Sequence, residues 1–321
     1  METLLKTPKA VRQARESQKG LHWALEIAVF FVLFIICSVS EVLVMIPVET
    51  AMLMGNQDYL DAAAAGDAER IAEAIMASSG KDLTVIMSLF ATGIMILLVI
   101  LFCRLIQKRK ITSLGFVKKG WPMEYLKGIA AGFGLFSAAV LICVLMGAIR
   151  LEYTSNTFSL PVFGLFTAGF MVQGMAEEVL CRGYFMVSLA RRYSITAAVI
   201  VNAAAFAALH LLNPGISLLA VVNLTLFGIF ASVCFIKTEN IWLVGALHSV
   251  WNLVQGNVYG IKVSGMETSC TVFSSAMTEG MELLNGGDFG LEGGLAVTIV
   301  FMAGIAFFLF YKKFKKDLAV E

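Results

Sequence analysis

Eight long apolar stretches dominate this sequence and restrict the folds open to it. They cover residues 24–46, 83–103, 128–149, 162–190, 194–212, 216–236, 241–259 and 294–311. Each has close to the ~20 residues that an α-helix needs to cross a hydrocarbon layer about 30 Å thick. A backbone in lipid must satisfy its own hydrogen bonds, and the alternating strands of a membrane barrel are not seen. The sequence therefore predicts an all-α, polytopic membrane protein with about eight transmembrane helices.

Composition excludes two other classes of protein. Of the 321 residues, 59% are apolar and 15% are charged, and the mean hydropathy is +0.83. Because soluble proteins carry roughly a quarter charged residues, a water-soluble globular domain is excluded. The formal net charge of +1 argues against a nucleic-acid binder, since such binding requires many clustered Lys and Arg side chains.

The positions of Lys and Arg predict the orientation of the chain. Residues 1–23 carry five basic and two acidic side chains, and residues 104–127 carry seven basic and one acidic. Residues 47–82, between the first two apolar stretches, carry seven acids and two bases. Because cytoplasmic segments are enriched in Lys and Arg, we expect the N- and C-termini to be cytoplasmic. The first apolar stretch is too long for a signal peptide, so we expect it to be a retained helix.

Two outer segments have weaker patterns. Residues 57–78 place charged residues among Ala and Ile at helical spacing, which is typical of an amphipathic helix on the outer surface or of a solvated loop helix. Residues 260–293 are rich in Gly, Ser and Thr, and we expect an irregular outer loop. Five of the six cysteines lie inside apolar stretches, and no C-x-x-C pair indicates a metal site or disulfide framework.

Three ionisable residues lie close together in the fourth apolar stretch. Glu177, Glu178 and Arg182 fall near its middle, where a charged group costs at least about 2.5 kcal/mol in a membrane. On a helix, Glu178 and Arg182 share a face as an i,i+4 pair, whereas Glu177 points about 100° away. An ion pair between Glu178 and Arg182 leaves Glu177 free as the candidate general base.

Two further polar pairs have the same spacing. The fifth stretch contains Phe206 and His210, and the seventh contains His248 and Asn252. Histidine is uncommon at bilayer depth and needs a polar partner, so these residues and the glutamates predict one shared interior site. The competing interpretation is that each polar cluster only joins neighbouring helices by hydrogen bonds.

Other polar residues in the apolar stretches receive simpler interpretations. We expect Glu26 and Glu41, near the two ends of the first stretch, to lie at the membrane interface. Gln173, Asn202 and Asn223 are further candidates for lining the interior site, although buried amides often serve only to join helices.

The three motifs together resemble those of the CPBP intramembrane proteases, a family that includes the CAAX prenyl endopeptidases and Abi-type bacteriocin-processing relatives. They are E-E-x-x-x-R at 177–182, F-x-x-x-H at 206–210 and H-x-x-x-N at 248–252. The segment Ser113-Leu114-Gly115-Phe116 is also similar to one that precedes the family's core. The resemblance implies that Glu177 and His210 activate a water molecule and that His248 and Asn252 stabilise an oxyanion. It also implies that Glu178 and Arg182 brace the site and that Phe206 shapes it.

The resemblance gives a domain organisation. A basic N-terminus (1–23) precedes two helices with an acidic outer and a basic inner loop (24–124). The catalytic core follows (125–259), then an outer loop (260–293), and a last helix with a basic tail (294–321).

The cofactor prediction follows from the same residues. Glu177, His210 and His248 form the type of ligand set found in many catalytic zinc sites, so zinc is one alternative. The sequence has no H-E-x-x-H motif, and we favour a mechanism without a cofactor.

The function predicted from the sequence is an intramembrane endopeptidase that cleaves a hydrophobic or lipidated peptide. Its expected partners are this peptide and membrane lipid, and we expect no nucleic acid. The expected location is a prokaryotic cell membrane. The sequence indicates no oligomeric state. The alternative is a non-enzymatic transporter or immunity-type protein that uses the same buried residues as a relay. A repeat-built transporter should show interrupted helices in matched halves, and Asn213-Pro214-Gly215 at the edge of a stretch is the sole candidate interruption.

Overall fold

Helices arranged in layers make up most of the protein. The computed structural model describes residues 7–17, 19–79, 82–154 and 158–317. The N-terminal helices are α1 (Lys9–Arg15), α2 (Trp23–Met54), α3 (Gln57–Ala65), α4 (Ala68–Ser79), α5 (Asp82–Ala91) and α6 (Gly93–Leu101). Helix α6 continues into a π-helical turn, Phe102–Ile106, so that 82–106 forms one long apolar helix with a small irregularity at Thr92.

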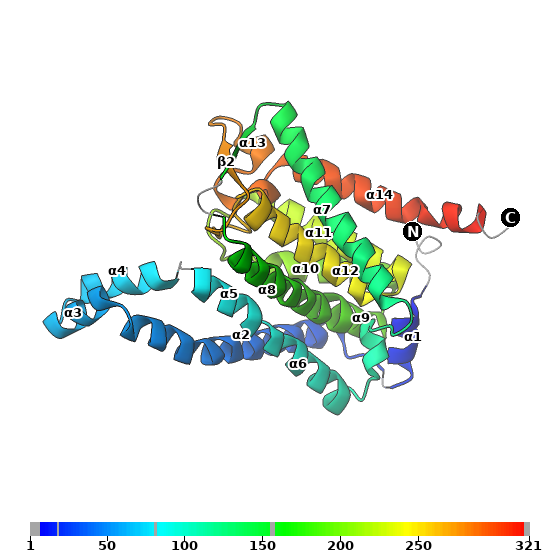
Figure 1. Cartoon of the computed structure of the whole chain (residues 1–321). Coiled ribbons are helices and arrows are strands. Elements are labelled where there is room, and N and C mark those ends of the chain that lie inside the picture. Colours follow the sequence, from blue (N-terminus) through cyan, green and yellow to red (C-terminus); the bar gives the residue numbers. More distant parts are fainter. Residues whose placement is uncertain (1–6, 18, 80–81, 155–157, 318–321) are drawn as a thin grey trace.

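The remaining helices form the body of the molecule. They are α7 (Trp121–Leu145), α8 (Leu160–Glu178), α9 (Val187–Ala190), α10 (Ile195–Ala208), α11 (Leu218–Thr238), α12 (Ile241–Leu253), α13 (Glu282–Asn285) and α14 (Leu295–Asp317). A π-helical segment, Val179–Met186, joins α8 to α9 without a break. Figure 1 shows α8 between α2, α5 and α6 on one side and α12 and α7 on the other.

Small residues allow the central helices to approach closely. A Cβ atom at Gly128 or Gly132 of α7 would overlap the backbone carbonyl of Leu243 or Leu247 in α12. One at Gly174 of α8 would overlap the backbone of Ser249 in α12. Close backbone contact at small residues is a main source of helix association in lipid, where burial of apolar side chains gives little driving force. These contacts fix the register of α12, which contains His248 and Asn252.

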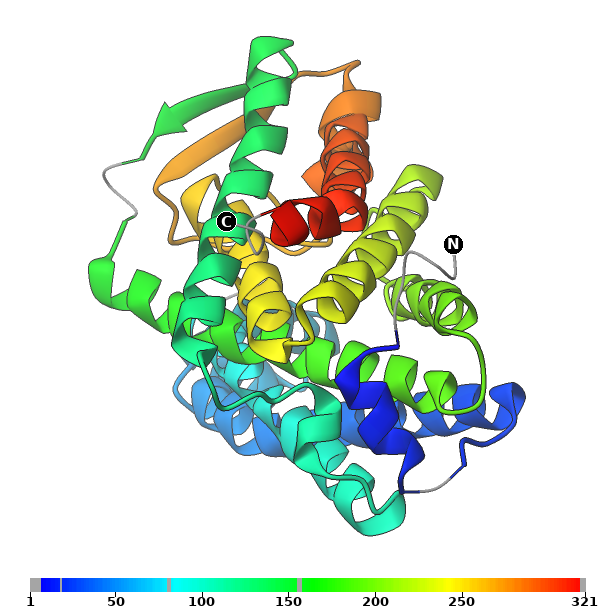
Figure 2. The ribbon, with the colours of Figure 1, turned by 90° about the vertical axis from the view of Figure 1, so that its right-hand side faces the viewer.

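The all-α prediction needs one correction, because a short antiparallel ribbon is present. Strand β1 (Ile149–Tyr153) follows α7 and pairs with β2 (Phe273–Met277), with Ile149 opposite Met277. Figure 2 shows this ribbon beside the end of α7. The 260–293 segment is therefore not an irregular loop, since it contains β2, α13 and two 3₁₀ turns, Gly287–Phe289 and Leu291–Gly293. The predicted helix over 57–78 is likewise two helices, with Gly66 at φ 69° ending α3.

The membrane prediction is confirmed in its general form. Among the described residues, four helical segments are long and apolar enough to cross a membrane, at Trp23–Met54, Asp82–Ile106, Trp121–Leu145 and Leu218–Thr238. Helix α10 and residues 295–310 of α14 are shorter apolar helices. The count of eight spans and the cytoplasmic termini stay predictions.

Two charged residues are more deeply buried than the sequence analysis expected. Glu26 does not lie at an exposed interface, because its buried carboxylate pairs with Arg191 at 3.2 Å. Arg109, in the basic 104–127 segment, is also fully buried and donates hydrogen bonds to the carbonyls of Ser113 and Gly183. Burial lowers the pKa of Arg109 to about 10, so this side chain stays charged near neutral pH. Through these hydrogen bonds, Arg109 links the segment that follows residues 82–106 to the π-helical segment Val179–Met186.

Candidate functional site

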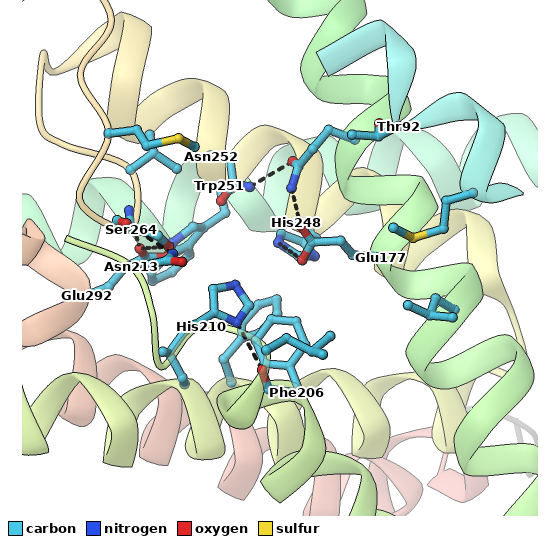
Figure 3. Close-up of a pocket in the computed structure, with 18 of the residues that line it drawn as sticks. Thr92, Glu177, Phe206, His210, Asn213, His248, Trp251, Asn252, Ser264 and Glu292 are labelled. Carbon is cyan, nitrogen blue, oxygen red and sulfur yellow. Dashed lines mark hydrogen bonds and ion pairs between the residues drawn. The ribbon is translucent and has the colours of Figure 1, made fainter. Parts of the chain in front are cut away.

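An interior cavity brings together the residues singled out in three separate stretches. Glu177 of α8, His248 and Asn252 of α12, and His210 after α10 all line it. The volume of the cavity is about 240 Å³. Figure 3 shows His210 facing the Glu177 and His248 side chains across the cavity. A space of this size accepts water and part of a peptide chain.

Glu178 and Arg182 form the ion pair expected from their spacing. Arg182 Nη1 lies 2.8 Å from Glu178 Oε1, and both side chains are fully buried. The guanidinium also lies over the Phe206 ring, 4.7 Å from its centre, and 5.4 Å from that of Phe227. The π-helical segment begins at Val179, directly after this glutamate, and such irregularities are frequent at functional sites.

His248 is held between the two glutamates. Its Nδ1 lies 2.8 Å from Glu178 Oε1, and its Nε2 lies 3.9 Å from Glu177 Oε2. Because an ionised carboxylate only accepts hydrogen bonds, Nδ1 is the donor to Glu178. This bond fixes the ring so that Nε2 points toward Glu177 and the cavity. Glu178 therefore orients His248 as well as pairing with Arg182.

The sequence analysis supposed that Glu177 is free, but in the structure its carboxylate accepts a hydrogen bond from a neighbouring side chain. Gln173 Nε2 donates a hydrogen bond to Glu177 Oε1, and Gln173 Oε1 accepts one from Asn252 Nδ2 at 3.0 Å. Gln173, expected to line the cavity, does so and also links Asn252 to Glu177. One amide hydrogen of Asn252 is used in this chain, and the second is left for a ligand.

His210 lies just beyond a helix rather than inside one. Helix α10 ends at Ala208, and His210 occupies the turn that follows. Its Nδ1 lies 2.9 Å from the carbonyl oxygen of Phe206, and the two rings are 4.8 Å apart. Since a carbonyl accepts, Nδ1 carries the proton, and Nε2 of the neutral ring is left as an acceptor.

Glu292 lines the cavity but had no clear signal in the sequence. Glu292, in the outer segment, accepts hydrogen bonds from Trp251 Nε1 at 3.2 Å and from the backbone N and Oγ of Ser264 at 3.0 and 2.8 Å. Asn223, a candidate from the sequence, does line the cavity, and its Nδ2 donates to the backbone carbonyl of Glu292 at 2.8 Å. The long separation of these partners along the chain hid the cluster from the sequence analysis.

Two other expectations are corrected by the structure. Glu41 lies on the cavity wall rather than at an outer interface. Asn202 is buried away from the cavity lining and donates to Ser232 Oγ at 3.1 Å, so it joins α10 to α11.

A metal ion needs several ligand side chains that converge on one point. In the described part of the chain, no group of three or more His, Cys, Asp or Glu side chains is placed to hold one. His248 Nδ1 is bonded to Glu178 and His210 Nδ1 to a backbone carbonyl, so only Nε2 of each ring is left as a possible ligand, as in many metal-bound histidines. Whether zinc binds stays a prediction, and the proposed chemistry uses side chains alone.

Comparison with known proteins gives one result. Residues 159–254 match the family model described as Rce1-like, type II CAAX prenyl endopeptidase. This segment contains all three motifs, from Glu177 to Asn252. No curated protein and no solved structure matches the chain. The match supports a hydrolase of the protease class in a membrane, and it confirms the family resemblance seen in the motifs. Over residues 159–254, the chain is therefore similar to the type II CAAX prenyl endopeptidases.

Proposed function

We propose that the protein is an intramembrane endopeptidase that cleaves a hydrophobic or lipidated peptide with a water molecule activated by Glu177. The observation that carries the proposal is the convergence of Glu177, His210, His248 and Asn252 on one interior cavity. Peptide hydrolysis requires a general base that activates water and hydrogen-bond donors that stabilise the oxyanion. Carboxylate, imidazole and amide groups in a cavity with little water can supply both. The family match supports the same reaction class.

The first chemical step is attack by water. A water molecule held between Glu177 and Nε2 of His210 loses a proton to the Glu177 carboxylate as its oxygen bonds to the peptide carbonyl carbon. The hydrogen bond from Gln173 fixes the orientation of that carboxylate. The carbonyl oxygen becomes an oxyanion, which the second amide hydrogen of Asn252 stabilises. A proton on Nε2 of His248 adds a second donor, because both ring nitrogens donate in the imidazolium form.

The second step breaks the peptide bond. The proton held by Glu177 passes to the nitrogen of the leaving amine, the C–N bond breaks, and a carboxylic acid and an amine result. Glu177 returns to the carboxylate form, so the site is restored. Glu178 keeps His248 in place throughout, since it holds Nδ1 at 2.8 Å.

A Glu177→Gln variant tests this proposal. Purified full-length protein in liposomes is incubated with a mixture of hydrophobic and lipidated membrane peptides, and the products are identified by mass spectrometry. We expect the wild type to produce cleaved peptides and the variant to be slower by about 10²-fold or more, the usual contribution of a general base. Asp58→Asn, on the outer helix α3, is the matched control for loss of one carboxylate. Equal cleavage by wild type and Glu177→Gln would exclude Glu177 as the base. If the wild type cleaves none of these peptides, the relay or transport function is favoured instead.

A further inference from the structure

Glu41 lies where two cavities meet. The catalytic cavity and a second cavity of about 440 Å³ share Ser38 and Glu41 of α2 and Val263 and Met266 of the outer segment. Helix α2 lies outside residues 159–254, the part of the chain that matches the family. The wall that separates the two cavities is therefore formed without the catalytic motifs.

The second cavity has the character of a binding groove for an apolar chain. It lies between α2, α5 and α8, with residues 263–268 on one side. Eight of the fifteen described residues along it are apolar, and they include Val42, Met45, Val85, Leu89 and Phe170. Pockets of about 300–1,000 Å³ with mainly apolar walls and a few polar groups are typical binding sites. A peptide with its scissile bond at Glu177 can place its neighbouring apolar residues here.

Apart from the histidines, the ionisable side chains along both cavities are acidic. The acids that line them are Glu41, Glu49, Glu177, Glu267 and Glu292. No Lys or Arg is among the described residues that line either cavity. A substrate that enters this space therefore meets carboxylates without a counter-charge on the wall.

Glu41 differs from the other acids because it has a buried oxygen without a partner, whereas Glu49, which also has no partner among the described residues, is exposed. Glu177 and Glu292 accept hydrogen bonds from neighbouring side chains, and Glu267 pairs with Lys262 at 3.4 Å. Glu41 Oε1 is buried and has no hydrogen-bond partner among the described residues. Leaving a buried polar atom without a partner is costly, and Glu41 faces the same cavity as the Glu177 carboxylate. A bound cation would supply the missing partner.

We propose that Glu41 is a specificity-determining residue that binds a positively charged side chain of the substrate beside the scissile bond. This inference rests on the proposed peptidase function. The substrate it describes has an apolar segment in the second cavity and a Lys or Arg side chain at the junction, where Glu41 is its partner. The family's catalytic motifs supply the cleavage, and α2 supplies this selection.

A set of matched peptides tests the inference. The peptides are apolar and internally quenched, and each carries Lys, norleucine or Glu at one test position. In successive sets of peptides, the test position is shifted by one residue from one side of the cleaved bond to the other. The kcat and KM of the full-length protein in detergent are measured for each peptide. We expect the wild type to prefer Lys over norleucine by about 10- to 100-fold in kcat/KM at one position, the usual effect of a charge-assisted hydrogen bond. Glu41→Gln should remove this preference mainly by raising KM for the Lys peptide. Glu41→Lys should prefer the Glu peptide. Glu69→Gln, on the exposed face of α4, should behave like the wild type.

The outcomes distinguish this inference from the peptidase proposal. Equal cleavage of Lys and norleucine peptides by the wild type, or a Lys preference retained in Glu41→Gln, overturns the role of Glu41 and leaves the peptidase intact. If the wild type cleaves no peptide, binding of the fluorescent Lys peptide is measured by anisotropy with Glu177→Gln and with the Glu41→Gln/Glu177→Gln double variant. Binding at least about tenfold weaker in the double variant supports Glu41 as the cation site, and equal binding overturns it.

Discussion

Replacement of Arg182 by Met provides a quantitative test of the buried charge cluster. Arg182 is fully buried and pairs with Glu178 at 2.8 Å, so its loss leaves the Glu178 carboxylate with only His248 as a close partner. Removing one member of a buried ion pair typically costs about 3–5 kcal/mol of stability. The Phe206 and Phe227 rings also lose a cation, and a desolvated contact of this kind contributes up to about 2 kcal/mol. We expect Arg182→Met to lower the free energy of unfolding by at least about 3 kcal/mol.

A double-mutant cycle separates the pair from general disruption. In Glu178→Gln/Arg182→Met no unpaired carboxylate is left at this position, so we expect the double variant to be more stable than Arg182→Met. The coupling free energy should be about 2 kcal/mol, measured by reversible unfolding in mixed micelles of detergent and SDS. The double variant should nevertheless be slower in peptide cleavage by about 10²-fold, because His248 has lost the carboxylate that orients it. Strictly additive single effects, or a cost below about 1 kcal/mol for Arg182→Met, would refute the reasoning.

Three other changes test separate contacts. Gly128→Ala should lower stability by about 1–3 kcal/mol in the same unfolding assay, because the new methyl group overlaps a backbone carbonyl of α12, whereas Gly134→Ala on the same helix meets no atom within 4 Å and should have little effect. Arg109→Met should cost at least about 1.5 kcal/mol, since several buried acceptors lose their donor, and exposed Lys118→Met should change stability by less than about 0.5 kcal/mol. Gln173→Leu breaks the link from Asn252 to Glu177, and we expect kcat to fall by about tenfold or more with KM nearly unchanged, measured with any peptide that the wild type cleaves.

The sequence was most informative where polar residues interrupt apolar stretches. The pairing of Glu178 with Arg182 follows from their i,i+4 spacing, and the structure contains it. His248 and Asn252 could be placed on one helix face for the same reason, and both line the cavity. At such positions local geometry and the cost of charge in lipid act together, so few arrangements are open to the chain.

Helix ends and irregularities were harder to predict. In a stretch that is apolar all round, hydrophobic periodicity contains little information about where a helix stops. For this reason the end of α10 before His210 and the π-helical segment after Glu178 were not foreseen. The β1–β2 ribbon was also missed, because it joins residues more than a hundred positions apart and each strand has only five residues.

Partners that are distant in the sequence account for the wrong assignments of single acids. Glu26 was expected at an interface, yet its partner Arg191 lies 165 positions away. Glu292, to which the sequence analysis assigned no role, accepts hydrogen bonds from Trp251 and Ser264. For Glu41, the hydropathy of α2 gives a depth in the membrane but not the direction in which the side chain points.

Helix α2 packs against the segment that matches the family, so two parts of the chain serve two different properties, cleavage of the substrate and its selection. Residues 159–254 hold the groups that are proposed to break a bond, whereas one wall of the same cavity comes from Phe34, Ser38 and Glu41, more than a hundred positions earlier. Changes in this first long helix can therefore alter which molecules are accepted without touching the reacting groups. Among proteins that share the same three motifs, the amino-acid sequence should then differ most in the helix that corresponds to α2.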